Sequence, residues 1–338
     1  MPRNRYYSGP QSDHFDGLRF FNPGQRSTDK SLRELLRWQL GGGRTRWPRV
    51  VEVRQAKPET RVAGLSVTMI GHASVLIQTS GLNILVDPIW SKRASPVSWA
   101  GPKRVARPGV LFEELPPIDV VLVTHNHYDH MDVGTLSRLQ AAHRPRIVTA
   151  LGNDAVIRRA ALGSDLVALD WDGAYELAPG MNVTAVPAHH WSARGRGDRR
   201  MALWCGFVIR TPEHLIYNVG DTGYGDGAIF REVRARFGAP DVAIIPIGAY
   251  EPRWFMADQH IDPGEAVRIM LDCGAEQALG VHWGTFQLTN EARDEPKRAL
   301  DTAMRQRGIE LDRFVAMEPG ASWSRDAGGA SARDGASS

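Results

Sequence analysis

Four of the six residues from 125 to 130 carry side chains that bind metal ions. They are His125, His127, Asp129 and His130, and they directly follow the apolar run DVVLVT. Imidazole and carboxylate are ligands that zinc prefers, and this supply exceeds what one tetrahedral ion takes from so short a segment. The spacing therefore indicates two adjacent metal ions. The alternative to a metal site is a polar loop whose histidines are hydrogen-bonded. This alternative is disfavoured because the hexapeptide directly follows an apolar run.

Further ligand side chains close other apolar runs of the chain. Together with the three in the hexapeptide, six of the eleven histidines follow an apolar run, and an aspartate closes another such run. Loops at the ends of strands are where a folded chain can gather distant side chains, so these residues are candidates for the same site. Outside the hexapeptide they are His189, His190, Asp221 and His282.

Alternating strands and helices must position these side chains. Short apolar runs predict strands, and periodic apolar patterns between some of them predict helices. This mixture indicates an α/β fold built in layers. The expected strands lie within 65–88 and at 119–125, 145–150, 165–170, 181–190, 205–212, 214–221 and 241–250, and the expected helices lie at 132–142, 152–162, 226–237 and 263–273.

Composition indicates a globular protein with a sizeable core. The chain has 338 residues, of which 42% are hydrophobic, and it contains no apolar run long enough for a transmembrane helix. The N-terminus lacks the apolar core of a secretory signal. Only two cysteines, Cys205 and Cys273, are present, which excludes a disulfide framework and favours a cytoplasmic setting.

Charge is unevenly placed along the chain. Residues 1–61 carry 13 Lys and Arg against 6 Asp and Glu, a balance of +7, whereas the remaining residues carry 28 against 32, a balance of −4. A basic arm suits an anionic partner, such as a phosphate-bearing substrate or a membrane surface, and an ordinary solvated surface is the alternative. Residues 1–61 are therefore expected to form a basic N-terminal arm, residues 62–320 the main domain, and residues 321–338, which lack an apolar period, a disordered tail.

One amphipathic helix is expected in the arm, from Asp29 to Leu40, before three glycines stop it. Its leucines fall on one face and its basic residues on the other. Packing of the leucine face on the helix's own domain is the favoured interpretation, and contact with a membrane surface, at the inner face of the membrane, is the alternative. The leucines are Leu32, Leu35, Leu36 and Leu40.

Longer motifs resemble a known family. Residues 125–130 match the HxHxDH signature of the metallo-β-lactamase superfamily. The segments GHASVLIQ, PAHHW, GDTGYGD, EPRWFM, QHIDP and VHWGTF are similar to the branch of N-acylphosphatidylethanolamine-hydrolysing phospholipases D and their bacterial relatives. The similarity covers residues 62–315, and residues 1–61 match less clearly.

The resemblance implies an αββα four-layer sandwich with two zinc ions per chain at one edge. It assigns His125, His127 and His190 to the first ion, with His189 beside it, and Asp221 as the bridge between the two ions. The second ion would take the remaining ligands, Asp129, His130 and His282.

The resemblance also implies the chemistry. A hydroxide bridging the two ions would attack phosphorus, with Asp129 and Asp221 as catalytic residues. His260, also expected to be catalytic, would bind a phosphate oxygen or protonate the leaving group, and Tyr128 and Gln259 would line the substrate site. Asp87 would either orient a ligand imidazole or cap its turn. Aromatic residues beside the motifs would form an acyl-chain wall or pack in the core, and they are Trp191, Trp254, Phe255 and Trp283.

The expected function is that of a zinc-dependent phosphodiesterase of the phospholipase D type, acting on N-acylphosphatidylethanolamine-like phospholipids. A zinc hydrolase of a small soluble phosphorylated ester or lactone is the alternative, because the same fold supports both. A nucleic-acid substrate is not expected, since no large inserted domain follows the metal motifs. A non-catalytic metal-binding protein is disfavoured by the full ligand set. The sequence leaves the oligomeric state open.

Overall fold

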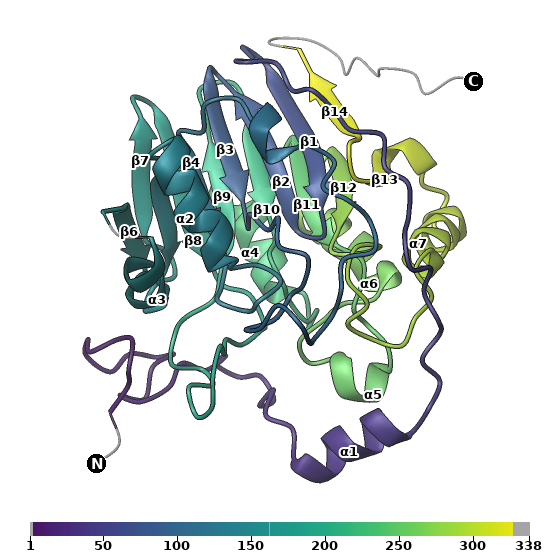
Figure 1. Ribbon diagram of the computed structural model, residues 1–338. Helices are drawn as coiled ribbons and strands as arrows, with labels where there is room; N and C mark the ends of the chain where they lie inside the picture. The colour runs from purple at the N-terminus through teal and green to yellow at the C-terminus, as the bar shows by residue number, and fades with distance from the viewer. Residues whose placement is uncertain (1–2, 162, 327–338) are drawn as a thin grey trace.

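The computed structural model describes residues 3–161 and 163–326, and two seven-stranded sheets face each other at its centre (Figure 1). The first sheet has the order β14-β1-β2-β3-β4-β5-β6. Strands β1 to β3 are antiparallel, and β3 to β6 run parallel. Its strands are β1 (Leu65–Gly71), β2 (Ser74–Thr79), β3 (Leu82–Val86), β4 (Val120–Val123), β5 (Arg146–Ala150), β6 (Asp165–Leu169) and β14 (Ser322–Arg325).

The second sheet has the order β13-β12-β11-β10-β9-β8-β7. Strands β10 to β13 are parallel, and β7 to β10 are antiparallel. Each sheet thus consists of a run of parallel strands beside a run of antiparallel strands. The strands are β7 (Ala174–Ala178), β8 (Met181–Val186), β9 (Gly206–Arg210), β10 (Leu215–Asn218), β11 (Val242–Pro246), β12 (Gln277–Val281) and β13 (Phe314–Ala316).

Helices cover the outer faces of both sheets. Alternate side chains of the strands fill one core between the sheets, and the others pack against helices on the outside. Four layers of the αββα type result, as the family resemblance implied. The first sheet is covered by α2 (Val133–Ala142) and α3 (Asn153–Ala160), and the second by α4 (Ala228–Phe237), α6 (Pro263–Cys273) and α7 (Glu295–Gln306).

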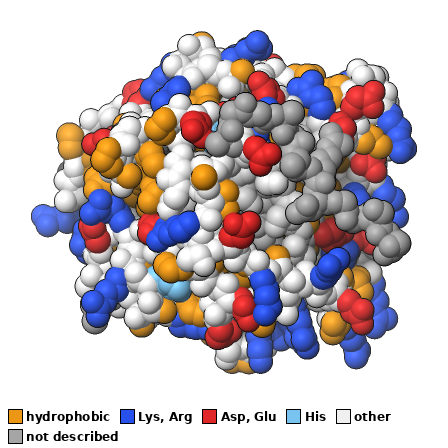
Figure 2. All heavy atoms as spheres, turned by 90° about the horizontal axis from the view of Figure 1, so that it is seen from above, with side chains coloured by type: hydrophobic (Ala, Val, Ile, Leu, Met, Phe, Trp, Pro, Cys, Tyr) orange, Lys and Arg blue, Asp and Glu red, His pale blue; other side chains and the backbone are white. Residues whose placement is uncertain are grey.

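The four helices expected between residues 132 and 273 are all present, with ends within two residues of their expected bounds. Two short 3₁₀ turns, Phe112–Glu114 and Leu311–Arg313, and the single-turn helix α5 (Arg253–Met256) complete the structure. None of the helices in the described part of the chain is long and apolar enough to cross a bilayer. At the end of the molecule opposite α1 (Leu32–Leu40), acidic and basic side chains are intermixed (Figure 2).

The N-terminal arm is part of the same folded unit. Phe15 and Phe20 are buried and belong to the core between the sheets. Asn22 donates a hydrogen bond to the carbonyl of His190 at 3.0 Å and accepts one from Trp204 at 3.1 Å. The arm is irregular before its helix, yet it is anchored on the domain by aromatic burial and hydrogen bonds.

The helix of the arm, α1 (Leu32–Leu40), is present, but the favoured interpretation of its packing is wrong. None of its residues is buried, and it lies apart from both sheets at the lower end of the molecule, below α5 (Figure 1). The reason is that Trp38 faces the domain, whereas Leu32, Leu36 and Leu40 are exposed to solvent. The Trp38 ring stacks on Phe255 with 4.8 Å between centroids, and its Nε1 donates to Asn290 Oδ1 at 3.1 Å.

The expected boundary of the C-terminal tail also needs correction. Ser322–Arg325 form β14, an edge strand paired antiparallel with β1, so disorder does not begin at residue 321. Backbone hydrogen bonds to a sheet edge do not require an apolar period, which is why the composition missed this strand. Arg325 also reaches across to Asp241 of the other half, with 2.6 Å between Nη1 and Oδ1. Residues 327–338 lie outside the described residues.

Candidate metal centre

The structure brings all of the predicted metal-binding side chains to one edge of the facing sheets. The hexapeptide 125–130 begins two residues after the end of β4 of the first sheet, and the other side chains lie in the loops that follow β8, β10 and β12 of the second. Because strands β10 to β12 are parallel, their carboxyl ends meet at the same edge. Residues far apart in the sequence thereby form overlapping groups of three or four ligand atoms, drawn from His125, His127, Asp129, His130, His190, Asp221 and His282 together with His72 and His260.

The first group consists of His125, His127 and His190. His127 Nδ1 lies 2.8 Å from His125 Nε2 and 3.2 Å from His190 Nε2. Burial lowers the pKa of His127 and of His190 to about 3 and holds the pKa of His125 well below its usual value. All three are therefore neutral imidazoles, and nitrogen lone pairs that converge on one point fit a metal cation.

The second group contains Asp129, His130 and His282. His282 Nε2 lies 3.1 Å from His130 Nε2 and 3.4 Å from Asp129 Oδ2. Burial lowers the pKa of both histidines, but the carboxylates of Asp221 and Asp129 outweigh it: the pKa of His130 is well above its usual value and that of His282 is about 9. This point of the site therefore favours positive charge, and a metal cation there would replace the imidazolium protons.

Asp221 lies between the two groups. Its Oδ2 is 3.1 Å from Nε2 of both His130 and His282, and 3.7 Å from His190 Nε2. Burial raises the pKa of this carboxyl, but the positive charge on His130 and His282 holds it well below its usual range. Asp221 is thus an ionised carboxylate in reach of both groups, and it has the position required of a bridge between two cations.

The rear nitrogens of two ligand imidazoles are held by acceptors. Asp87 Oδ2 accepts from His130 Nδ1 at 2.8 Å, and Asp87 also accepts from the backbone and hydroxyl of Thr124. His190 Nδ1 donates to the carbonyl of Gln259 at 2.9 Å. Such partners fix the ring orientation and raise the basicity of the facing nitrogen. Of the two roles expected for Asp87, the structure supports orientation of a ligand imidazole.

His189 and Arg194, which are close to His190 in sequence, do not belong to the ligand groups. The backbone N–H of His189 donates to Thr222 Oγ1 at 2.9 Å, and its ring takes no part in the ligand groups. Arg194 belongs to the loop 192–202. Its Nη1 donates to the carbonyls of Asn126 and Met131, at 3.0 and 2.7 Å, and so supports the hexapeptide from behind.

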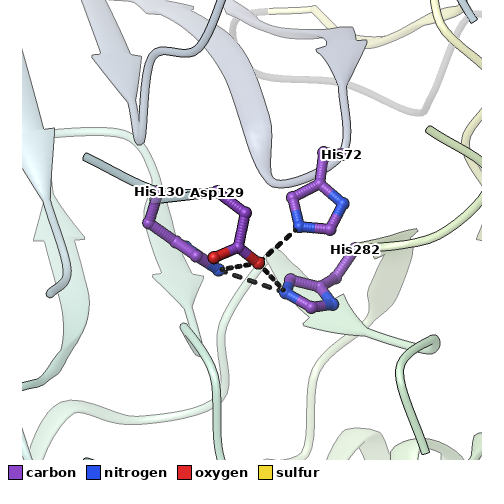
Figure 3. A group of neighbouring side chains, drawn as sticks. All are labelled: His72, Asp129, His130 and His282. Atoms are coloured by element: carbon purple, nitrogen blue, oxygen red, sulfur yellow. Dashed lines mark hydrogen bonds and ion pairs between the residues drawn. The ribbon is translucent and has the colours of Figure 1, made fainter. Parts of the chain in front are cut away.

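His72 was missed as a site residue, although its motif GHASVLIQ contributed to the resemblance. It lies in the turn between β1 and β2, and its side chain points at Asp129 and His282 (Figure 3). His72 Nε2 is 2.9 Å from Asp129 Oδ2. Its Nδ1 is buried without a hydrogen-bond partner among the described residues, and burial lowers its pKa to about 3. Since a carboxylate only accepts hydrogen bonds, the proton lies on Nε2 and is donated to Asp129.

The backbone of His72 reaches the other sheet as well. Its carbonyl accepts from the backbone N–H of His282 at 2.7 Å, and its own N–H donates to Thr285 Oγ1 at 2.9 Å. His72 and His282 both have left-handed backbones, with φ of 59° and 64°. Such strain persists where surrounding contacts over-determine the geometry. His72 is therefore a positioning residue that fixes Asp129 through its ring and His282 through its backbone.

Replacing His72 by leucine is expected to weaken metal binding by about 10- to 100-fold, because Asp129 loses the donor that orients it. His72→Gln, which keeps an N–H donor, is expected to recover part of the affinity. Chelator competition measures both values. His189→Leu is the matched control, since it removes a buried histidine whose ring belongs to none of the ligand groups. Equal losses in His72→Leu and His189→Leu would refute the positioning role.

A cleft of about 670 Å³ opens onto the cluster. It is lined by the three residues expected to meet substrate, by apolar side chains from α1, α5 and the loops, and by three of the predicted metal ligands, His127, Asp129 and Asp221. Of the aromatic residues beside the motifs, Trp191 and Phe255 line the cleft, Trp283 packs in the outer core, and Trp254 is exposed. The lining includes Tyr128, Gln259, His260, Asp129 and Asp221, with Leu35, Trp38, Met256 and Leu288.

The expected substrate residues differ in what they offer. His260 Nδ1 is buried, has no hydrogen-bond partner among the described residues, and lies 3.9 Å from Asp221 Oδ2. Gln259 Oε1 is also without a partner there, whereas its backbone carbonyl holds His190. The Tyr128 hydroxyl already donates to the carbonyl of Arg194. His260 is therefore the side chain best placed to meet a ligand beside the metal cluster.

Comparison with known proteins identifies the family. Residues 82–283 match the beta-lactamase superfamily domain. The chain belongs to the metallo-β-lactamase superfamily. Within it, the chain is 36% identical over 272 residues to N-acyl-phosphatidylethanolamine-hydrolyzing phospholipase D 1 of Caenorhabditis elegans, covering 77% of this chain and 76% of that protein. It is 34% identical to an uncharacterised protein of Mycobacterium tuberculosis, covering 80% and 73%.

Solved structures share the fold of this chain. An isothiocyanate hydrolase from Delia radicum gut bacteria superposes with a TM-score of 0.61 at 20% identity, covering 78% of this chain and 99% of that one. The metallo-hydrolase Igni18 of Ignicoccus hospitalis superposes with a TM-score of 0.57 at 21% identity and the same coverage. Together with the ligand groups, family membership makes this superfamily protein a metal-dependent hydrolase.

Proposed function

We propose that the protein is a zinc-dependent phosphodiesterase of the phospholipase D type, which hydrolyses N-acylphosphatidylethanolamine-like phospholipids to N-acylethanolamine and phosphatidic acid. The observation that carries the proposal is the position of Asp221. Its carboxylate lies close to imidazole nitrogens of both ligand groups, and it also lines the apolar cleft. Such a site can hold a phosphodiester at the metals and an acyl chain along the wall. The named activity of the Caenorhabditis elegans relative supports this choice of substrate.

Two zinc ions per chain are proposed for the site. His125, His127 and His190 would hold the first, Asp129, His130 and His282 the second, and Asp221 both. When bound, two such ions supply Lewis acidity toward phosphoryl oxygens and make a water acidic enough to attack at neutral pH. The neutral imidazoles of the first group and the carboxylates of the second match the ligand types that zinc takes.

The chain's own residues orient the substrate and the ligands. Asp87 and the Gln259 carbonyl hold His130 and His190 in place, and His72 holds Asp129. Burial lowers the pKa of His260 to about 3, so the free side chain is neutral. We therefore favour hydrogen bonding of His260 to a phosphate oxygen over protonation of the leaving group. Arg19 adds positive charge along the cleft, which suits an anionic diester.

Product analysis in oxygen-18 water tests the reaction. With N-acylphosphatidylethanolamine in mixed micelles, cleavage between phosphate and N-acylethanolamine is expected, and the label should enter the phosphate of phosphatidic acid. Label in a released fatty acid would make the protein an acyl hydrolase instead. Brisk cleavage of a soluble phosphorylated ester or lactone, without turnover of the lipid, would support the second candidate and overturn the proposal.

A further inference from the structure

Helix α1 presents a row of leucines to solvent. Leu32, Leu36 and Leu40, spaced four residues apart, lie one above the other on the helix, and their side chains are 78%, 56% and 81% exposed. The helix itself is well formed, since Ser31 and Glu34 make a reciprocal capping box at its start. A folded helix with an exposed apolar stripe is unusual in a soluble domain and marks a surface that contacts something else.

The contacts that α1 makes with the domain hold the helix so that the stripe of Leu32, Leu36 and Leu40 faces solvent. Trp38 stacks on Phe255 and donates to Asn290, and Lys30, just before the helix, pairs with Asp258 at 2.9 Å. The helical repeat places Trp38 on the side of α1 away from the stripe. The leucines are therefore exposed because the helix is held by other side chains.

Cations border the leucine stripe. Arg33 lies three residues before Leu36, and Arg37 lies three residues before Leu40, so both arginines lie beside the stripe on the helix surface. The Arg37 guanidinium lies 4.6 Å from the ring centroid of Trp254, itself 44% exposed. Apolar side chains bordered by arginines and an exposed tryptophan are the composition of a helix that lies in the interface of an anionic bilayer.

The same helix forms part of the wall of the candidate active site. Leu35 and Trp38 line the cleft that also contains Asp129, Asp221 and His260. A bilayer that received the stripe of α1 would thus lie beside the mouth of that cleft. A lipid could then reach the metal cluster without crossing water.

We propose that α1 is a membrane-docking helix, whose leucine stripe enters the interfacial layer of an anionic phospholipid bilayer while Arg33 and Arg37 pair with lipid phosphates. Delivery of substrate from that bilayer to the cleft rests on the proposed function, whereas docking itself does not. A second copy of the chain suits the surface less well. A twofold contact through the stripe would bring the arginines of both copies together, and like charges would repel each other.

Vesicle binding of the full-length protein tests the proposal. Sedimentation with phosphatidylcholine vesicles is compared with sedimentation with mixed phosphatidylcholine–phosphatidylglycerol vesicles, neither containing an N-acylated lipid. Binding to the anionic vesicles is expected, with loss at high salt. The triple variant Leu32→Gln, Leu36→Gln, Leu40→Gln should reduce the partition coefficient by about tenfold or more. Glutamine is a good helix former, so α1 should persist, which circular dichroism checks.

Two controls sharpen the experiment. Leu271→Gln removes a leucine of α6 that is 46% exposed, and it should leave vesicle binding unchanged. Light scattering measures the oligomeric state of each variant. Failure of the native protein to bind anionic vesicles would overturn the proposal, and so would a stripe variant that turns a dimer into a monomer with vesicle binding unchanged. Binding without turnover of N-acylphosphatidylethanolamine would uphold docking while contradicting the proposed function.

Discussion

Replacing Asp221 by asparagine is expected to lower the metal content below two ions per chain and nearly to abolish turnover. The carboxylate lies within 3.1 to 3.7 Å of imidazole nitrogens from both ligand groups. Asparagine has nearly the same shape, but it carries no negative charge and offers only one oxygen as a ligand. The substitution therefore removes charge from the point at which two cations would approach each other.

Asp226→Asn is the matched control for this experiment. Asp226 is exposed, and its carboxylate accepts a hydrogen bond from the backbone of Ala228 at the start of α4. Its loss should cost only part of a helix cap and leave turnover unchanged. Metal analysis by mass spectrometry and steady-state kinetics on the same preparations give the comparison. Comparable losses at both positions would show that Asp221 is not the bridge, and one metal ion per fully active native chain would refute the two-ion site.

His260→Ala is expected to keep the full metal content while kcat falls by about 10²-fold or more, the effect of removing one hydrogen-bond donor to a developing negative charge. The expectation follows from position: His260 lines the cleft beside the cluster, and its Nδ1 has no protein partner among the described residues. His143→Ala is the control, since His143 lies at the end of α2, where its ring accepts from the backbone of Ile118.

Measuring the metal content of His260→Ala distinguishes a substrate-binding role of His260 from a role as a metal ligand. Its ring nitrogen lies close enough to the ligand atoms of Asp221 and His190 to form a group with them, so His260 is also a candidate ligand. A variant that loses metal in proportion to activity would make it a ligand and would contradict the substrate role. A variant with unchanged metal and unchanged kcat would remove His260 from the reaction altogether.

Local patterns in the sequence predicted the elements and the candidates for the site. Helices such as 263–273 follow from apolar periodicity with a cap at Asp262 and glycine at 274, which act over a few residues and need no tertiary partner. The hexapeptide 125–130 after an apolar strand likewise indicated a metal site. His189, His190, Asp221 and His282 followed as candidates from the rule that ligand side chains at strand ends can meet at one sheet edge, and the family resemblance assigned His190 as the ligand.

Only the tertiary structure decided which side chains face the cluster and which surfaces stay exposed. His72 contacts Asp129 because the turn between β1 and β2 meets the loop after β12, a contact between two sheets that no local spacing reveals. Similarly, α1 turns its leucines to solvent because Trp38 stacks on Phe255, more than 200 residues later in the chain. A periodic pattern fixes which residues share a face, but the partner that covers one face of a helix is chosen by long-range packing.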